Sequence, residues 1–133
     1  MKTMSAYQMV IRACLPGELR DAEAIFLQTY HENADWIRDG IKKGLYRANT
    51  IDADGTPLYV IVWHKNDQGM MHVNALAQLN GGADFAFLMR GMKTLAKEFC
   101  CKAIQGVTVR AGLVKKLCEH GFKPVGVTML CEL

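Results

Sequence analysis

Apolar residues recur every three or four positions after residue 84, and this spacing predicts a long amphipathic helix over residues 85–99. Its polar face carries Arg90, Lys93 and Lys97. Gly91 lies inside this helix and costs about 1 kcal/mol relative to alanine, so we expect close packing there. The apolar face consists of Phe85, Leu88, Met89, Met92, Leu95, Ala96 and Phe99.

The N-terminal third predicts a strand followed by two helices. Tyr7–Cys14 has the pattern of a short strand, and Pro16 suits the first turn of a helix that extends to Tyr30. Asn33 caps a second, shorter helix, and Gly44 ends it.

Strands joined by tight turns follow. They cover residues 45–53, 58–63 and 70–77, with Asp54-Gly55 as the first turn and residues 66–69 as the second. Strands joined by hairpins are antiparallel. The middle strand, Leu58–Trp63, is apolar at every position, which is typical of a central strand covered on both faces.

The C-terminal third predicts a strand at Ala103–Val109, a helix at Ala111–His120 and a final strand at Val125–Cys131. Gly121 ends the helix in the left-handed conformation, and Phe122 folds back onto its last turn. Because helices join these later strands, each is expected to run parallel to the strand before it. The order β-α-α-β-β-β-α-β-α-β indicates an α/β fold, a mixed sheet with helices on both faces.

Composition narrows the function classes. Half of the 133 residues are hydrophobic, enough for the core of a single domain over residues 1–133. The net charge of +3 is scattered, which argues against nucleic-acid binding and suits a small anionic ligand. No run of about 18 apolar residues occurs, and Met1–Met9 lacks a signal-peptide core, so we expect a cytoplasmic protein without a membrane span. The five cysteines include no CxxC pair, which predicts buried, reduced thiols and no metal.

A glycine-rich loop, Gln78-Leu79-Asn80-Gly81-Gly82-Ala83, joins the strand at 70–77 to the long helix. Main-chain N–H groups freed by such a loop at a helix N-terminus bind phosphate oxygens. The alternative is a plain strand-to-helix turn, for which Asn-Gly-Gly is ordinary.

These six residues fit the pattern Q/R-x-x-G-x-G/A, and together with the element order they make the chain resemble the Gcn5-related N-acetyltransferases (GNATs) over nearly its whole length. Val73 precedes Gln78 at the family's spacing, and Leu117–Phe122 resembles the segment that ends a later family helix.

The resemblance implies acetyl-CoA as co-substrate and direct attack of a primary amine, not identified by the sequence, on its thioester. It implies that the fourth and fifth strands splay apart and that the pantetheine arm pairs with the fourth strand at Met71, His72 and Val73. It also implies that the pyrophosphate binds the loop and the residue after it, namely Gln78, Leu79, Asn80, Gly81, Gly82, Ala83 and Asp84.

The chain departs from the family pattern in three ways. Leu117 takes the place of a tyrosine that can protonate the leaving sulfur, and the adjacent Cys118 faces elsewhere on the helix. Asp84 is a good helix cap, but its charge repels pyrophosphate. We expect room for one strand after Phe122, which leaves the acceptor pocket open or completed by a second subunit in a homodimer.

His72 and Glu32 are the candidate bases, and His64 is a further one, because a histidine titrates near neutrality. The alternative for each is a half-exposed strand residue or a solvated loop residue. Trp36 is expected to face the core, with a pocket wall as the alternative, and Cys100-Cys101 to be packing residues. The alternative function is a catalytically silent binding or assembly module with the same fold.

Overall fold

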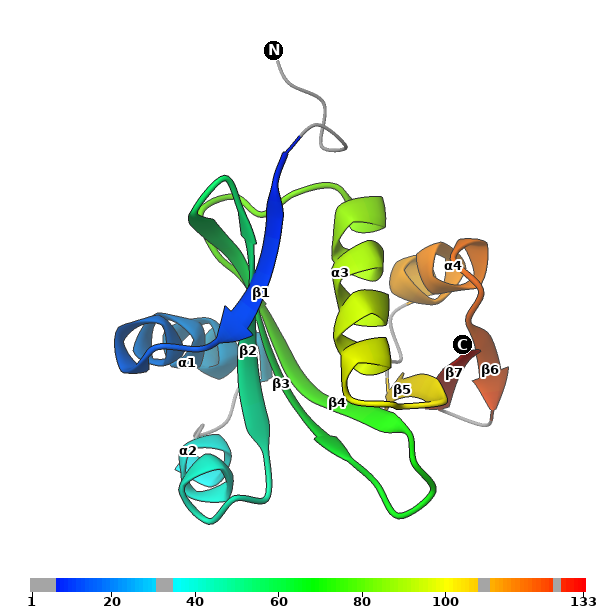
Figure 1. The fold of residues 1–133 in the computed structure, drawn as a ribbon, viewed down its shortest axis with the longest axis horizontal. Helices are drawn as coiled ribbons and strands as arrows, with labels where there is room; N and C mark the ends of the chain where they lie inside the picture. Colours follow the sequence, from blue (N-terminus) through cyan, green and yellow to red (C-terminus); the bar gives the residue numbers. More distant parts are fainter. Residues whose placement is uncertain (1–6, 31–34, 108–110, 126–127) are drawn as a thin grey trace.

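The computed structural model describes residues 7–30, 35–107, 111–125 and 128–133, which form a twisted mixed sheet with helices on both faces (Figure 1). No helix among these residues is both long and apolar enough to cross a bilayer. The elements are β1 (Met9–Ala13), α1 (Pro16–Tyr30), α2 (Asp35–Lys42), β2 (Arg47–Ala53), β3 (Thr56–Lys65), β4 (Met71–Gln78), α3 (Phe85–Glu98), β5 (Ala103–Val107), α4 (Ala111–Glu119), β6 (Lys123–Val125) and β7 (Thr128–Glu132).

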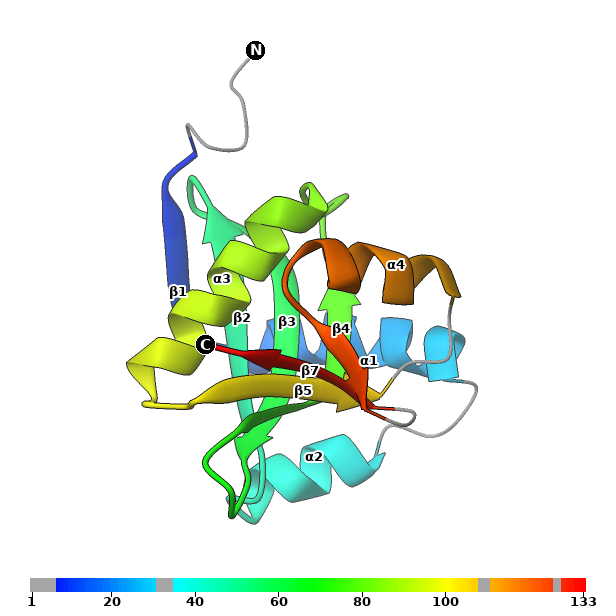
Figure 2. The same ribbon diagram turned by 90° about the vertical axis from the view of Figure 1, so that its right-hand side faces the viewer.

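The strand order in the sheet is β1-β2-β3-β4-β5-β7-β6. β1 to β4 are antiparallel neighbours, and β5 runs parallel to β4. Helices α1 and α2 cover one face, whereas α3 and α4 cover the other, the face turned toward the viewer in Figure 2. The mixed sheet covered on both faces is confirmed.

The C-terminal strands correct the sequence prediction in number and direction. Lys123–Val125 and Thr128–Glu132 form two strands, β6 and β7, which pair antiparallel with each other. β7, the second of the two, lies beside β5 and runs antiparallel to it. The sequence predicted one strand over Val125–Cys131 because the lone glycine in Val-Gly-Val is a weak turn signal.

Two glycine positions explain how helices approach the sheet so closely. A Cβ at Gly91 of α3 would lie 2.6 Å from Ile51 Cδ1, so the expected close packing is confirmed. A Cβ at Gly40 of α2 would lie 2.2 Å from the ring of Tyr46, which therefore rests directly on the helix backbone. Any larger residue at Gly40 would push α2 away from the sheet.

The sheet separates two apolar clusters. On the α3 face, Ile51, Trp63 and Met71 are fully buried together with the apolar side of α3. On the α1 face, Val60 and Val62 pack against Phe26 of α1 and other buried residues of α1, α2 and β4. β3 contributes to both clusters, as its uninterrupted apolar sequence predicts.

Arg12 joins β1 to both β2 and the start of α1. Its Nε donates to Asp52 Oδ2 at 2.8 Å, and its Nη1 and Nη2 donate to the two carboxylate oxygens of Glu18 at 2.8 and 2.5 Å. Glu18 also accepts the N–H of Leu15 at 2.9 Å, which fixes the turn into α1. The carboxylate of Asp52 is 6% exposed, and its Oδ1 has no partner among the described residues.

This network predicts an acid-sensitive contribution to stability. The hydrogen bond from the Arg12 side chain lowers the pKa of Glu18 below 4.5. Desolvation opposes this shift, and the hydrogen bond from the Leu15 N–H adds to it. A carboxyl whose pKa is lower in the folded state stabilises the fold above its unfolded pKa and loses that contribution as the pH falls through the folded pKa. The urea concentration at the midpoint of unfolding should therefore decrease as the pH drops below about 4.5. This decrease should be smaller in the Glu18→Gln variant. A Glu18→Gln variant whose urea midpoint decreases at acid pH as much as that of the wild type would contradict the prediction.

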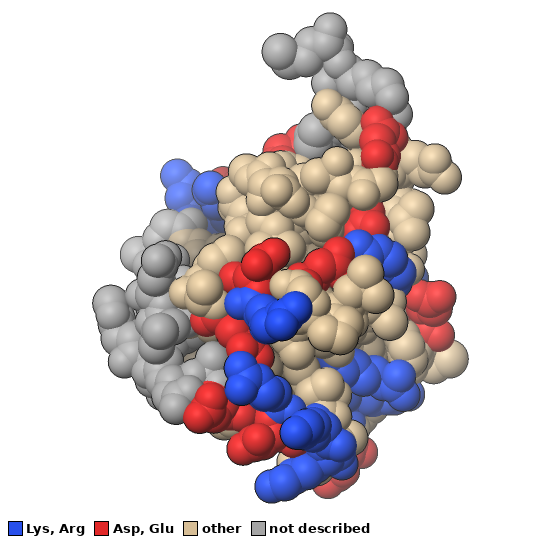
Figure 3. Space-filling model, turned by 90° about the vertical axis from the view of Figure 1, so that its left-hand side faces the viewer, with Lys and Arg blue, Asp and Glu red and all other residues tan. Residues whose placement is uncertain are grey.

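The outer surface of α1 and α2 carries charges of both signs side by side (Figure 3). One pair joins the two helices, because Arg38 Nε and Nη2 donate to Glu23 at 3.2 and 2.5 Å. Alternating charges of this kind indicate a solvated face and do not form a single basic stripe.

Candidate functional site

β4 and β5 begin as neighbours and then separate. They pair only at Met71 with Ile104 and at His72 with Gln105. Beyond these pairs a cavity of about 550 Å³ lies between the strands, within the size range of small-molecule sites. It is lined by residues 72–76 and 104–107, by Phe85, Leu88, Met89 and Met92 of α3, by Leu113 and Leu117 of α4, and by Phe122 and Met129.

The cavity receives side chains from both faces of the sheet. Val73 packs with the α3 cluster, whereas His72 contacts His64 and through it Tyr46, on the side of α2. Both Val73 and His72 line the cavity, so the gap between β4 and β5 is lined by side chains from both faces of the sheet. A ligand lying in the gap is therefore within reach of groups from either side.

β4 has a bulge at the edge of this cavity. Val62 pairs with Ala75 and the next residue, Trp63, pairs with Val73, so Asn74 has no partner in the β3 register. A bulge re-aims side chains and interrupts the ladder. Here it brings the Asn74 side chain to His64, whose Nδ1 lies 2.8 Å from Asn74 Oδ1.

The glycine-rich loop leads from the end of β4 to the start of α3. Three of its main-chain N–H groups already have protein acceptors: Leu79 donates to Leu58 O, Gly82 to Leu79 O and Ala83 to the Tyr59 hydroxyl. Five others have no protein acceptor among the described residues, namely those of Asn80, Gly81, Asp84, Phe85 and Ala86. The helix start therefore retains free donors, although fewer loop amides are available than the sequence suggested.

Side chains hold the loop in shape. The Tyr59 hydroxyl accepts from Ala83 N at 2.8 Å and donates to Ala83 O at 2.7 Å, and burial raises the pKa of this phenol. Gln78 Nε2 donates to Gly81 O at 2.8 Å. Gly82 has φ +63°, and a Cβ there would meet the Gln78 side chain at 2.5 Å, so the loop requires glycine at this position.

Asp84 caps α3, as expected. Its backbone is extended, with φ −68° and ψ 162°, and its Oδ1 accepts the N–H of Phe87 at 2.8 Å. A negative charge thus lies beside the free amides of the first turn of α3.

No family model matches the sequence, and no curated protein matches it either. Solved structures do match the fold. Ard1 from Thermoplasma volcanium superposes with a TM-score of 0.71 at 14% identity, over 94% of this chain and 97% of that one. A GNAT family acetyltransferase from Elizabethkingia anophelis, solved with acetyl-CoA bound, gives 0.71 at 11% identity over 94% and 98%. A Bacillus subtilis acetyltransferase in complex with CoA gives 0.69 at 11% identity over 96% and 99%.

The chain has the GNAT fold. The separation of β4 from β5 and the loop before α3, which the resemblance implied, are both part of this structure.

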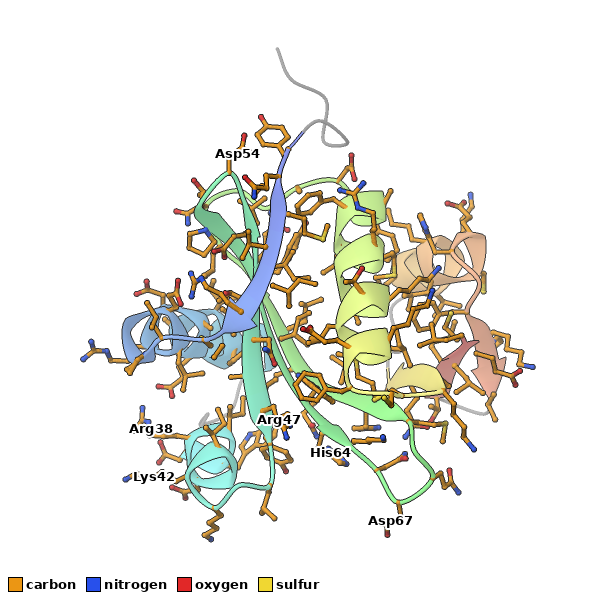
Figure 4. The ribbon with its side chains drawn as sticks, viewed as in Figure 1. Arg38, Lys42, Arg47, Asp54, His64 and Asp67 are labelled. Carbon is orange, nitrogen blue, oxygen red and sulfur yellow. The ribbon has the colours of Figure 1, made fainter. Side chains whose placement is uncertain are left out.

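Two histidines meet where the GNAT-fold strands separate. His64 and His72 are a cross-strand pair with ring centroids 5.2 Å apart, and Gln105 Nε2 of β5 lies 2.9 Å from His72 Nδ1 (His64 is labelled in Figure 4). Burial and the neighbouring His64 lower the pKa of His72, so its ring is predominantly neutral at pH 7. Glu32, the other candidate base, lies outside the described residues.

Two departures from the family pattern can be located in this GNAT fold. Leu117 lines the cavity and offers no proton to a leaving group. Cys118 is exposed and does not line the cavity, as the helical rotation of about 100° per residue predicts. Among the described parts of the chain, no group of His, Cys, Asp and Glu could hold a metal ion.

Some sequence predictions about side chains are wrong. Trp36 does not face the core: it is 37% exposed and lies edge-on to Tyr46. Of the five cysteines, Cys101 and Cys131 are buried, but Cys100 and Cys118 are exposed. Trp36 and Cys118 lie near an end of their helices and Cys100 lies just beyond the end of α3, where an apolar periodicity no longer decides which side faces solvent.

Sequence reasoning missed Tyr59, Asn74 and Gln105. Tyr59 holds the loop from a strand that reads only as core, and Gln105 meets His72 only because β5 lies beside β4. The one available signal was that Asn74 and Gln105 are amides within otherwise apolar strands.

Proposed function

We propose that this chain is an acyl-CoA-dependent N-acetyltransferase that moves an acetyl group from acetyl-CoA to a primary amine. The observation that carries the proposal is the gap between β4 and β5, which holds a 550 Å³ cavity and lies beside a helix start with free amides. Solved proteins with this fold include ones bound to acetyl-CoA or CoA.

The cofactor half of the proposal uses main-chain groups. Beyond His72, the edge of β4 has no β5 partner, so an extended pantetheine arm can pair with it like an added strand from Val73 onward. Met71 and His72 pair with β5 and mark the closed end of the gap. The pyrophosphate then meets the free N–H groups of the loop and the first turn of α3. Gln78, Leu79, Gly82 and Ala83 hold the loop in shape through their own hydrogen bonds.

The part of the proposal that concerns the amine acceptor uses the face of the sheet covered by α1 and α2. An amine that approaches the gap from the α2 side of the sheet meets Tyr46 and His64 before it reaches His72. Catalysis is then mainly positioning, together with removal of a proton from the ammonium. Glu32 is a second candidate for holding that ammonium.

The departing thiolate needs no side-chain acid in this scheme. A thiol has a pKa near 8.5, so CoA thiolate takes up a proton from the newly formed amide nitrogen or from water. Leu117 leaves the cavity apolar at the place where the acetyltransferases of this fold often have a tyrosine hydroxyl.

Isothermal titration with acetyl-CoA tests the cofactor half. We expect saturable heat that is competed by CoA, followed by acetyl transfer to at least one member of a panel of primary amines. Absence of heat and of competition at millimolar ligand would overturn the proposal.

Replacement of Asp84 separates capping from charge. Asparagine caps a helix about as well as aspartate, so Asp84→Asn should leave the melting temperature unchanged. It removes the repulsion between the Asp84 carboxylate and the pyrophosphate, which is about 1 kcal/mol for two charges about 4 Å apart in water, so CoA should bind roughly fivefold more tightly. Asp67→Asn, an exposed position in the β3–β4 turn, is the matched control and should change neither quantity (Figure 4). Weaker CoA binding by Asp84→Asn would contradict the prediction.

The capping carboxylate also favours the second candidate, a catalytically silent binding module with this fold, because it already supplies an anion at the helix start. The two candidates differ in one measurement. A silent module transfers no acetyl group to any amine. An enzyme shows turnover, and this turnover is lost when a bulky side chain fills the gap between β4 and β5.

A further inference from the structure

Two imidazole rings face each other beside the gap, on the face of the sheet covered by α1 and α2. His64 of β3 and His72 of β4 are directly opposite, with an interplanar angle of 44°. Their planes do not stack, and no hydrogen bond joins the two rings directly among the described residues. Each ring instead has its own side-chain amide partner.

The two amides bind the rings in opposite senses. Asn74 presents its carbonyl oxygen, Oδ1, to His64 Nδ1 at 2.8 Å. Gln105 presents its amino nitrogen, Nε2, to His72 Nδ1 at 2.9 Å. A carbonyl oxygen can only accept, and an amide NH₂ can only donate.

With the two amides in these orientations, each neutral ring carries its proton on a different nitrogen. His64 must have its proton on Nδ1 in order to donate to Asn74, which leaves Nε2 as a free acceptor. His72 must accept on Nδ1, which leaves its proton on Nε2. The hydrogen bond at one ring nitrogen sets the role of the other, so two identical side chains acquire opposite functions.

We propose that Asn74 and Gln105 hold the histidine pair in opposite tautomers, so that His64 Nε2 accepts the proton of the substrate ammonium while His72 Nε2–H donates a hydrogen bond into the gap. This inference rests on the proposed function. It identifies the base as His64, which does not line the cavity, and not His72, which does. Asn74 is then a positioning residue that acts through His64.

The proton balance is simple. The acceptor arrives as R–NH₃⁺ and transfers one proton to His64 Nε2, which gives an imidazolium and the free amine R–NH₂. The amine lone pair attacks the thioester carbon, so a C–N bond forms and the C–S bond breaks. The second nitrogen proton goes to the thiolate, and His64 returns its proton to solvent.

Long-range ¹H–¹⁵N NMR of the ligand-free protein tests the tautomers directly, at a pH where both rings are neutral. His64→Gln and His72→Gln assign the two signals. We expect the proton on Nδ1 of His64 and on Nε2 of His72. The reverse arrangement, or the same tautomer in both rings, would overturn the proposal.

Kinetics at saturating acetyl-CoA test the roles. His64→Gln should lower kcat at least about 100-fold, the usual contribution of a general base, without changing KM for acetyl-CoA. His72→Gln retains an N–H donor and should lose less than about tenfold, whereas His72→Leu loses the donor and should lose more than His72→Gln. Equal losses in the two glutamine variants, or a larger loss in His72→Gln, would overturn the assignment.

The two proposals fail in different ways. A wild-type protein that transfers no acetyl group overturns the proposed function, and the catalytic roles with it, while the ring spectra still test the tautomers. A wild-type enzyme with normal turnover but reversed tautomers overturns only the inference about the histidine pair.

Discussion

Gly106→Leu should abolish acetyl-CoA binding while leaving the protein folded. Gly106 lies on β5 and lines the cavity, and a Cβ at this position would lie 3.9 Å from Val73 Cβ across the gap. The backbone there is not in the left-handed region, so leucine fits without strain. Its remaining carbons would fill the space between β4 and β5 that the pantetheine arm needs.

We expect the dissociation constant for acetyl-CoA to rise at least about 100-fold, equivalent to roughly 2.7 kcal/mol. The melting temperature should stay the same or rise, because glycine weakens a strand and leucine adds apolar contacts in the cavity. Titration calorimetry and thermal unfolding of the same preparations measure the two effects.

Gly17→Leu is the matched control for this change. Gly17 lies in the first turn of α1, and a Cβ there would have only Arg20 Nη2 nearby, at 3.9 Å. This variant should bind acetyl-CoA as the wild type does. A folded Gly106→Leu protein with wild-type affinity would show that acyl-CoA does not bind between β4 and β5.

Arg12→Met should cause a large loss of stability. Methionine keeps most of the aliphatic volume but removes the only cation bound to Asp52 and Glu18 within the described structure. Loss of one partner of a buried ion pair costs about 3–5 kcal/mol. Because Arg12 is itself 31% exposed, we expect about 3 kcal/mol, measured by urea denaturation at pH 7.

Two further variants separate the buried charge from other causes. In Arg12→Met/Asp52→Leu, the uncompensated charge is removed, so the double variant should be more stable than Arg12→Met alone. Lys123→Met breaks an ion pair with Glu132 whose side chains are 64% and 71% exposed, and should cost less than about 1 kcal/mol. Equal losses in Arg12→Met and Lys123→Met would show that burial of Asp52 adds nothing.

Local patterns in the sequence identified most helices and strands. The periodicity from Phe85 onward predicted α3 to within one residue, and Pro16 and Tyr30 bound α1 as expected. Asp54 and Gly55, with φ of +49° and +84°, form the turn that the sequence indicated. These features depend on neighbours within a few positions, so a single sequence contains enough information to predict them.

Local patterns did not identify the paired C-terminal strands. Each of β6 and β7 is short, and the choice of β7 as the neighbour of β5 depends on contacts between residues about 25 positions apart in sequence. Long-range pairing of this kind has no local signature.

The candidate site divides in the same way. The glycine loop and the cap at Asp84 could be recognised from the sequence because both lie within one continuous segment. The occupied amides, the bulge at Asn74 and the partner of His72 could not, because each requires a side chain or backbone group from another strand.

By itself, the sequence determined the order of elements from β1 to α4, the glycine loop and the presence of a histidine in each of two strands that form a hairpin. Only the tertiary structure decided that β4 and β5 separate after two residue pairs and that opposite amide groups meet the two rings. The physical reason is that periodicity and turn preference act within a segment, whereas a gap and a tautomer depend on which atoms of distant segments come within hydrogen-bonding distance.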